Sequence, residues 1–260
     1  MVNAHSKESE PTITQPSAGF DSVTSGAYEV GTEVTPAYDA NFSAGSYSYG
    51  PATGVTVTSW EVTDTAGNTL DTEKGSFPAI TVADGTNYKI TAKANHTAGA
   101  TPLTNWENET TGAIAEGSKS STSSAITGYR SFFYGVLNTS STEQPLTSAL
   151  VREGKDSEGN VVDTALTNGG NYNASKTFTL NGSATAKRIV VLIPSTSTRS
   201  GLKEVILTSA MNTPVTDSYT KTTAAVKVEG VNGATAIDYT AYVYEPASID
   251  AGEVHKITLA

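Results

Sequence analysis

The chain has 260 residues and no cysteine, and its 26 acidic residues against 16 basic ones give a formal net charge of −10. Such an acidic chain offers no basic surface to a phosphate backbone, which excludes nucleic acid as a main partner. The lack of cysteine excludes disulfide scaffolds, thiol catalysis and cysteine-ligated zinc. The longest aliphatic run, residues 189–193, is far shorter than the roughly 20 apolar residues of a membrane span, so no membrane partner is expected.

Residues 1–26 differ from the rest of the chain in composition. They are rich in serine and threonine, they contain Pro11, Pro16 and Gly19, and they show no apolar periodicity. Residues 1–8 also lack the apolar stretch of a secretory signal. This composition is typical of a segment that orders on a partner. We therefore expect an extended N-terminal arm over residues 1–26 that docks onto another protein.

From residue 27 onward the pattern is that of β-strands. Apolar and polar residues alternate over residues 88–95, which predicts a strand with one buried face. In the preceding strand the apolar residues move from odd to even positions between Val57 and Trp60. One extra residue, at position 58 or 59, would produce this shift, so we expect a β-bulge or a strand break there. Residues 27–108 are predicted to form a β-sandwich domain.

Three residues of this domain suggest a more specific fold. Trp60 lies within a strand, and Asp84 and Tyr88 follow it at the spacing of a tyrosine corner, in which the tyrosine hydroxyl bonds back to the backbone. The pattern resembles that of immunoglobulin-like domains, with Ile90 where antibody domains carry the second cysteine. The alternative is any Greek-key strand that begins with a tyrosine.

Residues 109–127 separate this domain from the next. They include the low-complexity run GSKSSTSS, which has the composition of a flexible linker. The C-terminal domain, residues 128–260, then opens with the densest aromatic cluster of the chain. Aromatic residues at this density either anchor a core or line an interface. The interface candidates are Tyr129, Phe132, Phe133 and Tyr134.

The C-terminal domain is predicted to be rich in β-strands with one short helical insertion. Residues 142–152 carry an N-cap, an early proline and apolar residues at helical spacing, and Gly154 follows as a stop signal. The segment that starts at Arg188 is continuously apolar, which predicts a central strand covered on both faces. The expected strands are residues 177–180, 188–193, 224–228, 237–244 and 253–259.

The sequence contains no motif with a specific chemistry. The histidines, His5, His96 and His255, are far apart, and we expect His255 at an edge or a core rim. The acidic turns at Asp156 and Asp64 offer oxygen donors of the kind that Ca²⁺ binds, but hairpins use the same spacing. We therefore predict a non-enzymatic protein with no catalytic residue, no metal site and no cofactor. Carboxylate pairs that any acidic protein supplies are Glu107 with Glu109 and Asp238 with Glu245.

Four phrases of the sequence carry a family resemblance: VGTEVTP (30–36), SYSYGP (46–51), GYRSFFYG (128–135) and YVYEPASIDAG (242–252). They resemble virion structural proteins of tailed bacteriophages, in particular head or tail fibre and appendage proteins of the crAss-like gut phage type. The resemblance implies immunoglobulin-like or related β-sandwich modules that project from a capsid or a tail as oligomers and contact the host surface. It carries over no catalytic residue, and this chain lacks the coiled-coil heptads of a trimeric shaft.

We therefore expect tandem β-sandwich domains in a virion fibre or decoration protein that is assembled in the host cytoplasm. Its partners would be other virion proteins, bound through the N-terminal arm, further copies of the chain, and a host surface glycan. A first alternative is a carbohydrate-binding or adhesive module of a bacterial surface protein. A second alternative is a polysaccharide hydrolase, which would need two convergent carboxylates. Aromatic residues that could stack on sugar rings are Tyr47, Tyr49, Trp106 and Tyr242.

Overall fold

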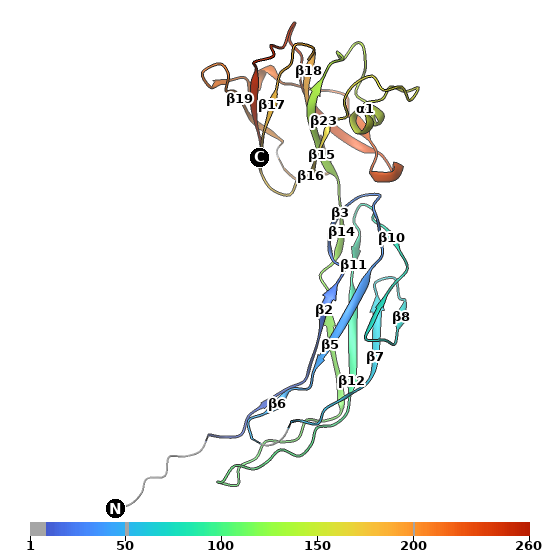
Figure 1. Cartoon of the computed structure of the whole chain (residues 1–260), viewed down its shortest axis with the longest axis vertical. Coiled ribbons are helices and arrows are strands. Elements are labelled where there is room, and N and C mark those ends of the chain that lie inside the picture. Colours follow the sequence, from blue (N-terminus) through green and yellow to red (C-terminus); the bar gives the residue numbers. More distant parts are fainter. Residues whose placement is uncertain (1–8, 50–51, 200) are drawn as a thin grey trace, which may run out of the picture. The chain divides into compact units, whose positions relative to one another are not determined.

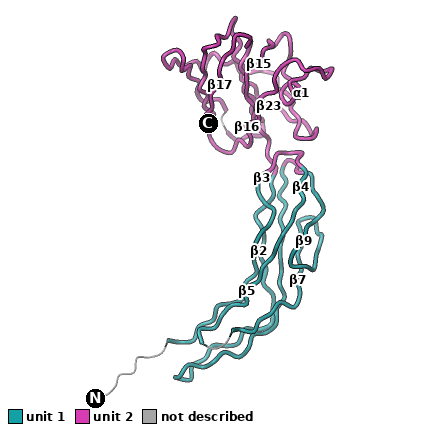
Figure 2. Tube along the Cα trace, viewed as in Figure 1, with its two compact units in different colours: residues 1–27, 33–81, 85–127 teal, residues 28–32, 82–84, 128–260 magenta. Residues whose placement is uncertain are grey.

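The computed structural model describes residues 9–49, 52–199 and 201–260 (Figure 1). The fold is mainly β, as predicted, and the strands of the described residues pair in antiparallel fashion. The chain divides into two compact units, which Figure 2 colours separately. Unit 1 consists of residues 1–27, 33–81 and 85–127, and unit 2 of residues 28–32, 82–84 and 128–260. The second unit thus contains the whole predicted C-terminal domain and two short segments from the first half of the chain.

Unit 1 contains a three-stranded sheet of order β2-β5-β9 and a four-stranded sheet of order β13-β12-β7-β8, and β12 packs against β2 and β5. The strands of these two sheets are β2 (Ser17–Val23), β5 (Ala37–Ser43), β9 (Lys74–Ser76), β13 (Gly117–Thr122), β12 (Ile90–His96), β7 (Val57–Asp64) and β8 (Thr69–Leu70). Shorter pairings involve β1 (Ile13–Thr14) with β6 (Ser46–Tyr47), β4 (Glu33–Val34) with β10 (Ile80–Thr81), and β14 (Ile126–Tyr129) with β11 (Asn87–Tyr88) and β3 (Gly26–Glu29).

The predicted irregularity of β7 is confirmed. Asn95 of β12 pairs with Ser59 and His96 pairs with Val57, so Thr58 is an extra residue that β12 does not match. The alternation predicted for β12 is also present, because Ile90, Ala92 and Ala94 are buried while the residues between them are only partly covered. The bulge allows both ends of β7 to keep their apolar side chains on the buried face.

Two segments expected to be irregular are strands instead. The predicted arm is wrong for residues 17–23, which form β2 and pair with β5. The predicted linker is wrong for residues 117–122, which form β13 and pair with β12 along their whole length. Both strands are poor in large apolar residues, and backbone hydrogen bonds to a well-patterned neighbour hold them in place. Residues 1–8 of the arm lie outside the described residues.

Unit 2 contains two sheets. The larger has the order β16-β15-β18-β23, and the outer edge of β23 pairs with two short strands, β21 and β22. The smaller has the order β17-β24-β19-β20. The strands are β15 (Ser131–Leu137), β16 (Thr167–Asn171), β17 (Lys176–Asn181), β18 (Arg188–Pro194), β19 (Leu202–Leu207), β20 (Thr213–Pro214), β21 (Thr220–Lys221), β22 (Val226–Val228), β23 (Ile237–Tyr244) and β24 (Val254–Leu259).

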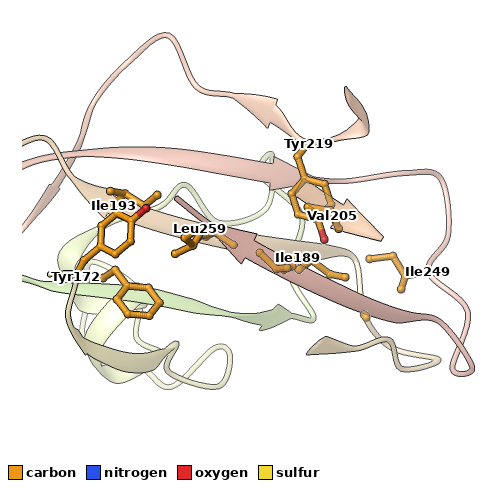
Figure 3. Close-up of a cluster of buried hydrophobic side chains, with 11 residues drawn as sticks. Tyr172, Ile189, Ile193, Val205, Tyr219, Ile249 and Leu259 are labelled. Carbon is orange, nitrogen blue, oxygen red and sulfur yellow. The ribbon is translucent and has the colours of Figure 1, made fainter. Parts of the chain in front are cut away.

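The centre of unit 2 is β18, in which all seven residues are buried. Ile189, Val191 and Ile193 belong to a core shared with the smaller sheet, part of which Figure 3 shows. Val190 and Leu192 point to the opposite face and join a second core. The larger sheet is therefore covered on both faces, as the continuous apolar run predicted.

The second core is closed by the single α-helix of the described ranges, α1 (Ser148–Glu153). Thr147 caps its first turn by accepting a hydrogen bond from the Leu150 N–H at 3.2 Å. Gly154 ends the helix at φ 70°, a left-handed conformation that favours glycine. The prediction of one short helix stopped by Gly154 is confirmed, although the helix begins later than expected. Short 3₁₀ turns, η1 (Thr216–Ser218) and η2 (Val231–Gly233), lie between later strands.

Candidate functional site

The aromatic segment proposed as an interface is largely buried in the two cores of unit 2. Phe132 and Phe133 are each only 2 % exposed and belong to opposite faces of β15. Tyr134 is partly buried and stacks on Phe178 with 4.0 Å between ring centroids. The interface role is therefore wrong for Phe132 and Phe133, because alternation along a strand sends neighbouring side chains into different cores. Tyr129 is also partly buried.

A buried ion pair that the sequence did not reveal joins two distant parts of unit 2. The Arg152 guanidinium donates to the Glu29 carboxylate at 2.6 Å, and both side chains are largely buried. Asn168 donates to the second oxygen of the same carboxylate at 2.8 Å. Arg152 also donates to the carbonyl of Glu229 and lies over the Phe133 ring, 5.0 Å from its centroid. These contacts fix the segment 28–32 against the C-terminal part of the unit.

A second ion pair fixes the segment 82–84. The Arg130 Nε donates to Asp84 Oδ1 at 3.0 Å, and its Nη2 donates to the other carboxylate oxygen. This bidentate hydrogen bonding lowers the pKa of Asp84, although burial opposes the shift. The Arg130 side chain is almost fully buried, whereas that of Asp84 is half exposed. Asp84, expected as part of a tyrosine corner, therefore pairs with an arginine of unit 2.

Tyr88, the tyrosine expected at that corner, also bonds to a different partner from the one predicted. The Tyr88 hydroxyl donates to the Asp64 carboxylate at 2.8 Å, not to the backbone, so the corner as predicted is wrong. Asn68 also donates to Asp64, through its backbone N–H and its side-chain amide. Burial would raise the pKa of Asp64, but these hydrogen bonds outweigh it and lower the pKa. Trp60 lies within β7 opposite Ala94 and is partly exposed.

The Asp64 contacts predict a pH dependence of the stability of unit 1. Because the folded-state pKa lies below the ordinary value of 3.8, Asp64 contributes stability above that pH. This contribution is lost as the pH falls from 3.8 through the folded-state pKa. We expect Asp64→Asn to lower the free energy of unfolding by about 1–3 kcal/mol at pH 7 and to reduce the loss of stability in acid.

Urea unfolding followed by tryptophan fluorescence at pH 7 and pH 3 tests this expectation, since both tryptophans lie in unit 1. Glu61→Gln is the matched control, because Glu61 forms an exposed pair with Lys93 that should contribute little. An Asp64→Asn variant with the stability of the wild type at both pH values would contradict the role of these hydrogen bonds.

The two histidines within the described residues, His96 and His255, belong to different units. His255, predicted at an edge or rim, is fully buried on the central strand β24, so that prediction is wrong. Its ring nitrogens lie 3.0 Å from the Tyr219 hydroxyl and 3.0 Å from the Glu253 carboxylate. Burial raises the pKa of Tyr219, which keeps the hydroxyl protonated. His96 is buried in unit 1, and His5 lies outside the described residues.

The chain itself engages three of the acidic candidates, Asp156, Asp238 and Glu245, whereas Glu107 has a buried carboxylate oxygen with no hydrogen-bond partner in the described structure. The Asp156 carboxylate accepts from the backbone N–H groups of Glu158 and Asn160, both at 2.9 Å, which is hairpin chemistry. Asp238 pairs with Lys227 and Glu245 accepts from the Ser141 N–H. Among residues 9–49, 52–199 and 201–260, no group of three or more histidine, aspartate or glutamate side chains is placed to hold a metal ion.

The clearest exposed aromatic surface lies on a turn of unit 1. Trp106 is 62 % exposed and Leu103, three residues before it, is 57 % exposed. The buried Asn105 side chain fixes this turn, because its Oδ1 accepts from the N–H groups of Glu107 and Glu109 at 3.1 and 2.9 Å. Large apolar side chains exposed on a fixed turn are candidate contacts for a partner or a sugar ring. We call Leu103 and Trp106 the Trp106 surface.

The other aromatic residues considered for sugar contact are engaged in the fold. The Tyr47 hydroxyl donates to the Ala100 carbonyl at 2.9 Å, and the Tyr49 hydroxyl donates to the Ser9 carbonyl at 2.9 Å.

The described part of the chain contains no helix that is long and apolar enough to cross a membrane. No protein-family model, curated protein or solved structure matches this chain.

Proposed function

We propose that this chain is a non-enzymatic structural protein of a tailed-bacteriophage virion, a fibre or decoration component attached to the capsid or the tail. The observation that carries the proposal is that ion pairs hold distant segments of the chain together within unit 2. Two segments from the first half of the chain are fixed in it by the Glu29–Arg152 and Asp84–Arg130 ion pairs. These pairs hold distant segments of the chain in one unit, and the phrase GYRSFFYG of the phage resemblance contains Arg130 itself.

The chemistry of the chain supports the same proposal. The cores of unit 2 are aliphatic and aromatic, and the chain contains no cysteine. A protein of this kind keeps the same covalent state in the reducing host cytoplasm and in a released particle. Assembly in the cytoplasm followed by exposure outside the cell would therefore require no change of redox state.

The attachment arm is now proposed to be shorter than the sequence suggested. Ser9 accepts the hydrogen bond from Tyr49, and β1 and β2 belong to unit 1, so residues from Ser9 onward are part of a folded unit. Removing residues 1–26 would therefore damage unit 1 as well as any attachment. The informative deletion is residues 2–8, which leaves every described residue in place.

A phage that encodes this chain, purified to homogeneity, tests the proposal by quantitative mass spectrometry. We expect the chain in virions at a fixed stoichiometry to the major capsid protein, and mass photometry of the isolated protein should show an oligomer. Deletion of residues 2–8 should reduce incorporation, while Met211→Ser, at a fully exposed methionine, should leave it unchanged. Absence of the chain from purified virions would overturn the proposal.

The Trp106 surface favours a second candidate, a carbohydrate-binding or adhesive module. An exposed tryptophan ring can stack on the face of a sugar ring, and Trp106 is 62 % exposed. A glycan array at millimolar sugar should give a signal that Trp106→Ala abolishes and Met211→Ser leaves intact. A wild-type protein with no signal would remove this candidate without affecting the virion proposal.

A further inference from the structure

The edge of the larger sheet in unit 2 opens into a hollow. Lys221 pairs with Tyr242 and Val226 pairs with Tyr239, so four residues on the edge lie opposite only two on β23. Thr222 still donates to the Ala241 carbonyl at 2.9 Å, so residues 223–225 bulge away from the sheet. The hollow beside this bulge has a volume of about 460 Å³, within the range of small-molecule sites. Its wall includes Leu146, Val226, Val243, Thr220, Thr222 and Arg188.

Arg188 is the buried cation of this hollow, and the exposed Lys221 is the other cation in its wall. Arg188 is only 1 % exposed and shares the face of β18 that carries Val190 and Leu192. Its Nη2 donates to the Gln144 carbonyl at 2.6 Å. Within the described ranges its buried Nε has no hydrogen-bond partner, and no carboxylate lies within 4.0 Å of the guanidinium. A buried guanidinium with an unused donor is costly unless something else binds it.

The acidic residues whose charges act most on Arg188 are bonded to other groups. Burial lowers the pKa of Arg188, and the charges of Glu245, Asp163 and Glu143 oppose that shift. Glu245 accepts from a backbone N–H, Asp163 accepts from the N–H groups at the end of β15, and Glu143 pairs with a lysine. These carboxylates help to keep Arg188 charged, but in the described structure none of them bonds to its Nε.

We propose that this hollow binds an amphipathic carboxylate, whose carboxyl group bonds to Arg188 while its hydrocarbon part contacts Leu146, Val226 and Val243. A guanidinium presents parallel N–H donors that match a carboxylate, which favours this anion over a neutral ligand. The hydroxyl groups of Thr220 and Thr222 lie in the same wall and can orient the ligand. Both a free short-chain acid and the C-terminal residue of a peptide have this chemistry.

Nuclear magnetic resonance of the ¹⁵N-labelled full chain tests the site directly. Hexanoate represents a free acid and N-acetyl-leucine a peptide terminus, and hexanamide and N-acetyl-leucinamide are their neutral controls. We expect at least one acid to shift the Arg188 Nε–H signal in a saturable manner, and its amide to bind at least about tenfold more weakly. The Nε–H of Arg199, which also has no partner in the described structure, serves as an internal reference that should not move.

Two variants test whether binding of the acid depends on Arg188 in particular. Arg188→Met should reduce the affinity for the acid at least about tenfold, whereas Arg199→Met, beside Tyr172, should leave it unchanged. If Arg188→Met does not fold, the titration of the wild type decides alone. No shift of the Arg188 signal with either acid up to 20 mM (about 2.3 kcal/mol of binding free energy), or equal shifts with acid and amide, would overturn the proposal.

Discussion

Replacement of Arg152 by methionine should lower the free energy of unfolding of unit 2 by about 3–5 kcal/mol. The substitution leaves the Glu29 carboxylate largely buried, with Asn168 as its remaining side-chain partner. A buried charge that loses its counter-ion retains the full cost of leaving water. Hydrogen–deuterium exchange of peptides from β18 and β23 measures the stability of unit 2 by itself, and exchange should become faster in the variant.

The exposed pair of Lys155 and Glu153, beside the same helix, is the matched control. Lys155→Met should change stability by less than about 1 kcal/mol. The double variant Glu29→Gln with Arg152→Met should be less destabilised than the sum of the single variants, because neither group is then left as an unpaired charge. Strictly additive effects would contradict a direct pair between the two side chains.

Phe133→Ala should destabilise unit 2 by a comparable amount, about 3–5 kcal/mol. The ring is 2 % exposed, lies 6.0 Å from the Tyr239 ring, and supports the Arg152 guanidinium. Its removal leaves a cavity in the second core and takes away the surface on which Arg152 lies. Val161→Ala, at a residue 75 % exposed, is the control and should change stability by no more than about 0.5 kcal/mol.

The same exchange measurement distinguishes this packing role from an interface role. If Phe133 belonged to an interface, Phe133→Ala would change the oligomeric state and leave exchange in β18 at the wild-type rate. We expect the opposite result. Coupling between Phe133→Ala and Arg152→Met should also be measurable, because the two side chains are in contact.

Local periodicity predicted the parts of the fold that depend on local pattern. The extra residue in β7, the alternation of β12 and the buried run of β18 were all visible in the order of apolar and polar residues. Each of these features follows from which face of a strand is buried, and that is written in successive residues. The short helix was predictable for the same reason, since Gly154 is a local stop signal.

The features that the sequence did not reveal depend on partners far along the chain. Glu29 and Arg152 are 123 residues apart, and Arg130 and Asp84 are 46 apart, so no local pattern marks either pair. Strand β13 was missed because its serine-rich sequence is typical of linkers, and only its pairing with β12 makes it a strand. The hollow at Arg188 was missed because it arises from a mismatch between two paired strands.

Because unit 2 is built from segments that are far apart in the chain, it cannot finish folding until late in translation. Its first pieces, residues 28–32 and 82–84, are synthesised long before the strands that receive them. Its smaller sheet has β24, residues 254–259, between β17 and β19, so that sheet cannot close until this last strand has left the exit tunnel. Nascent chains that are released early would therefore expose unpaired strand edges, which makes them natural substrates for chaperones and proteases.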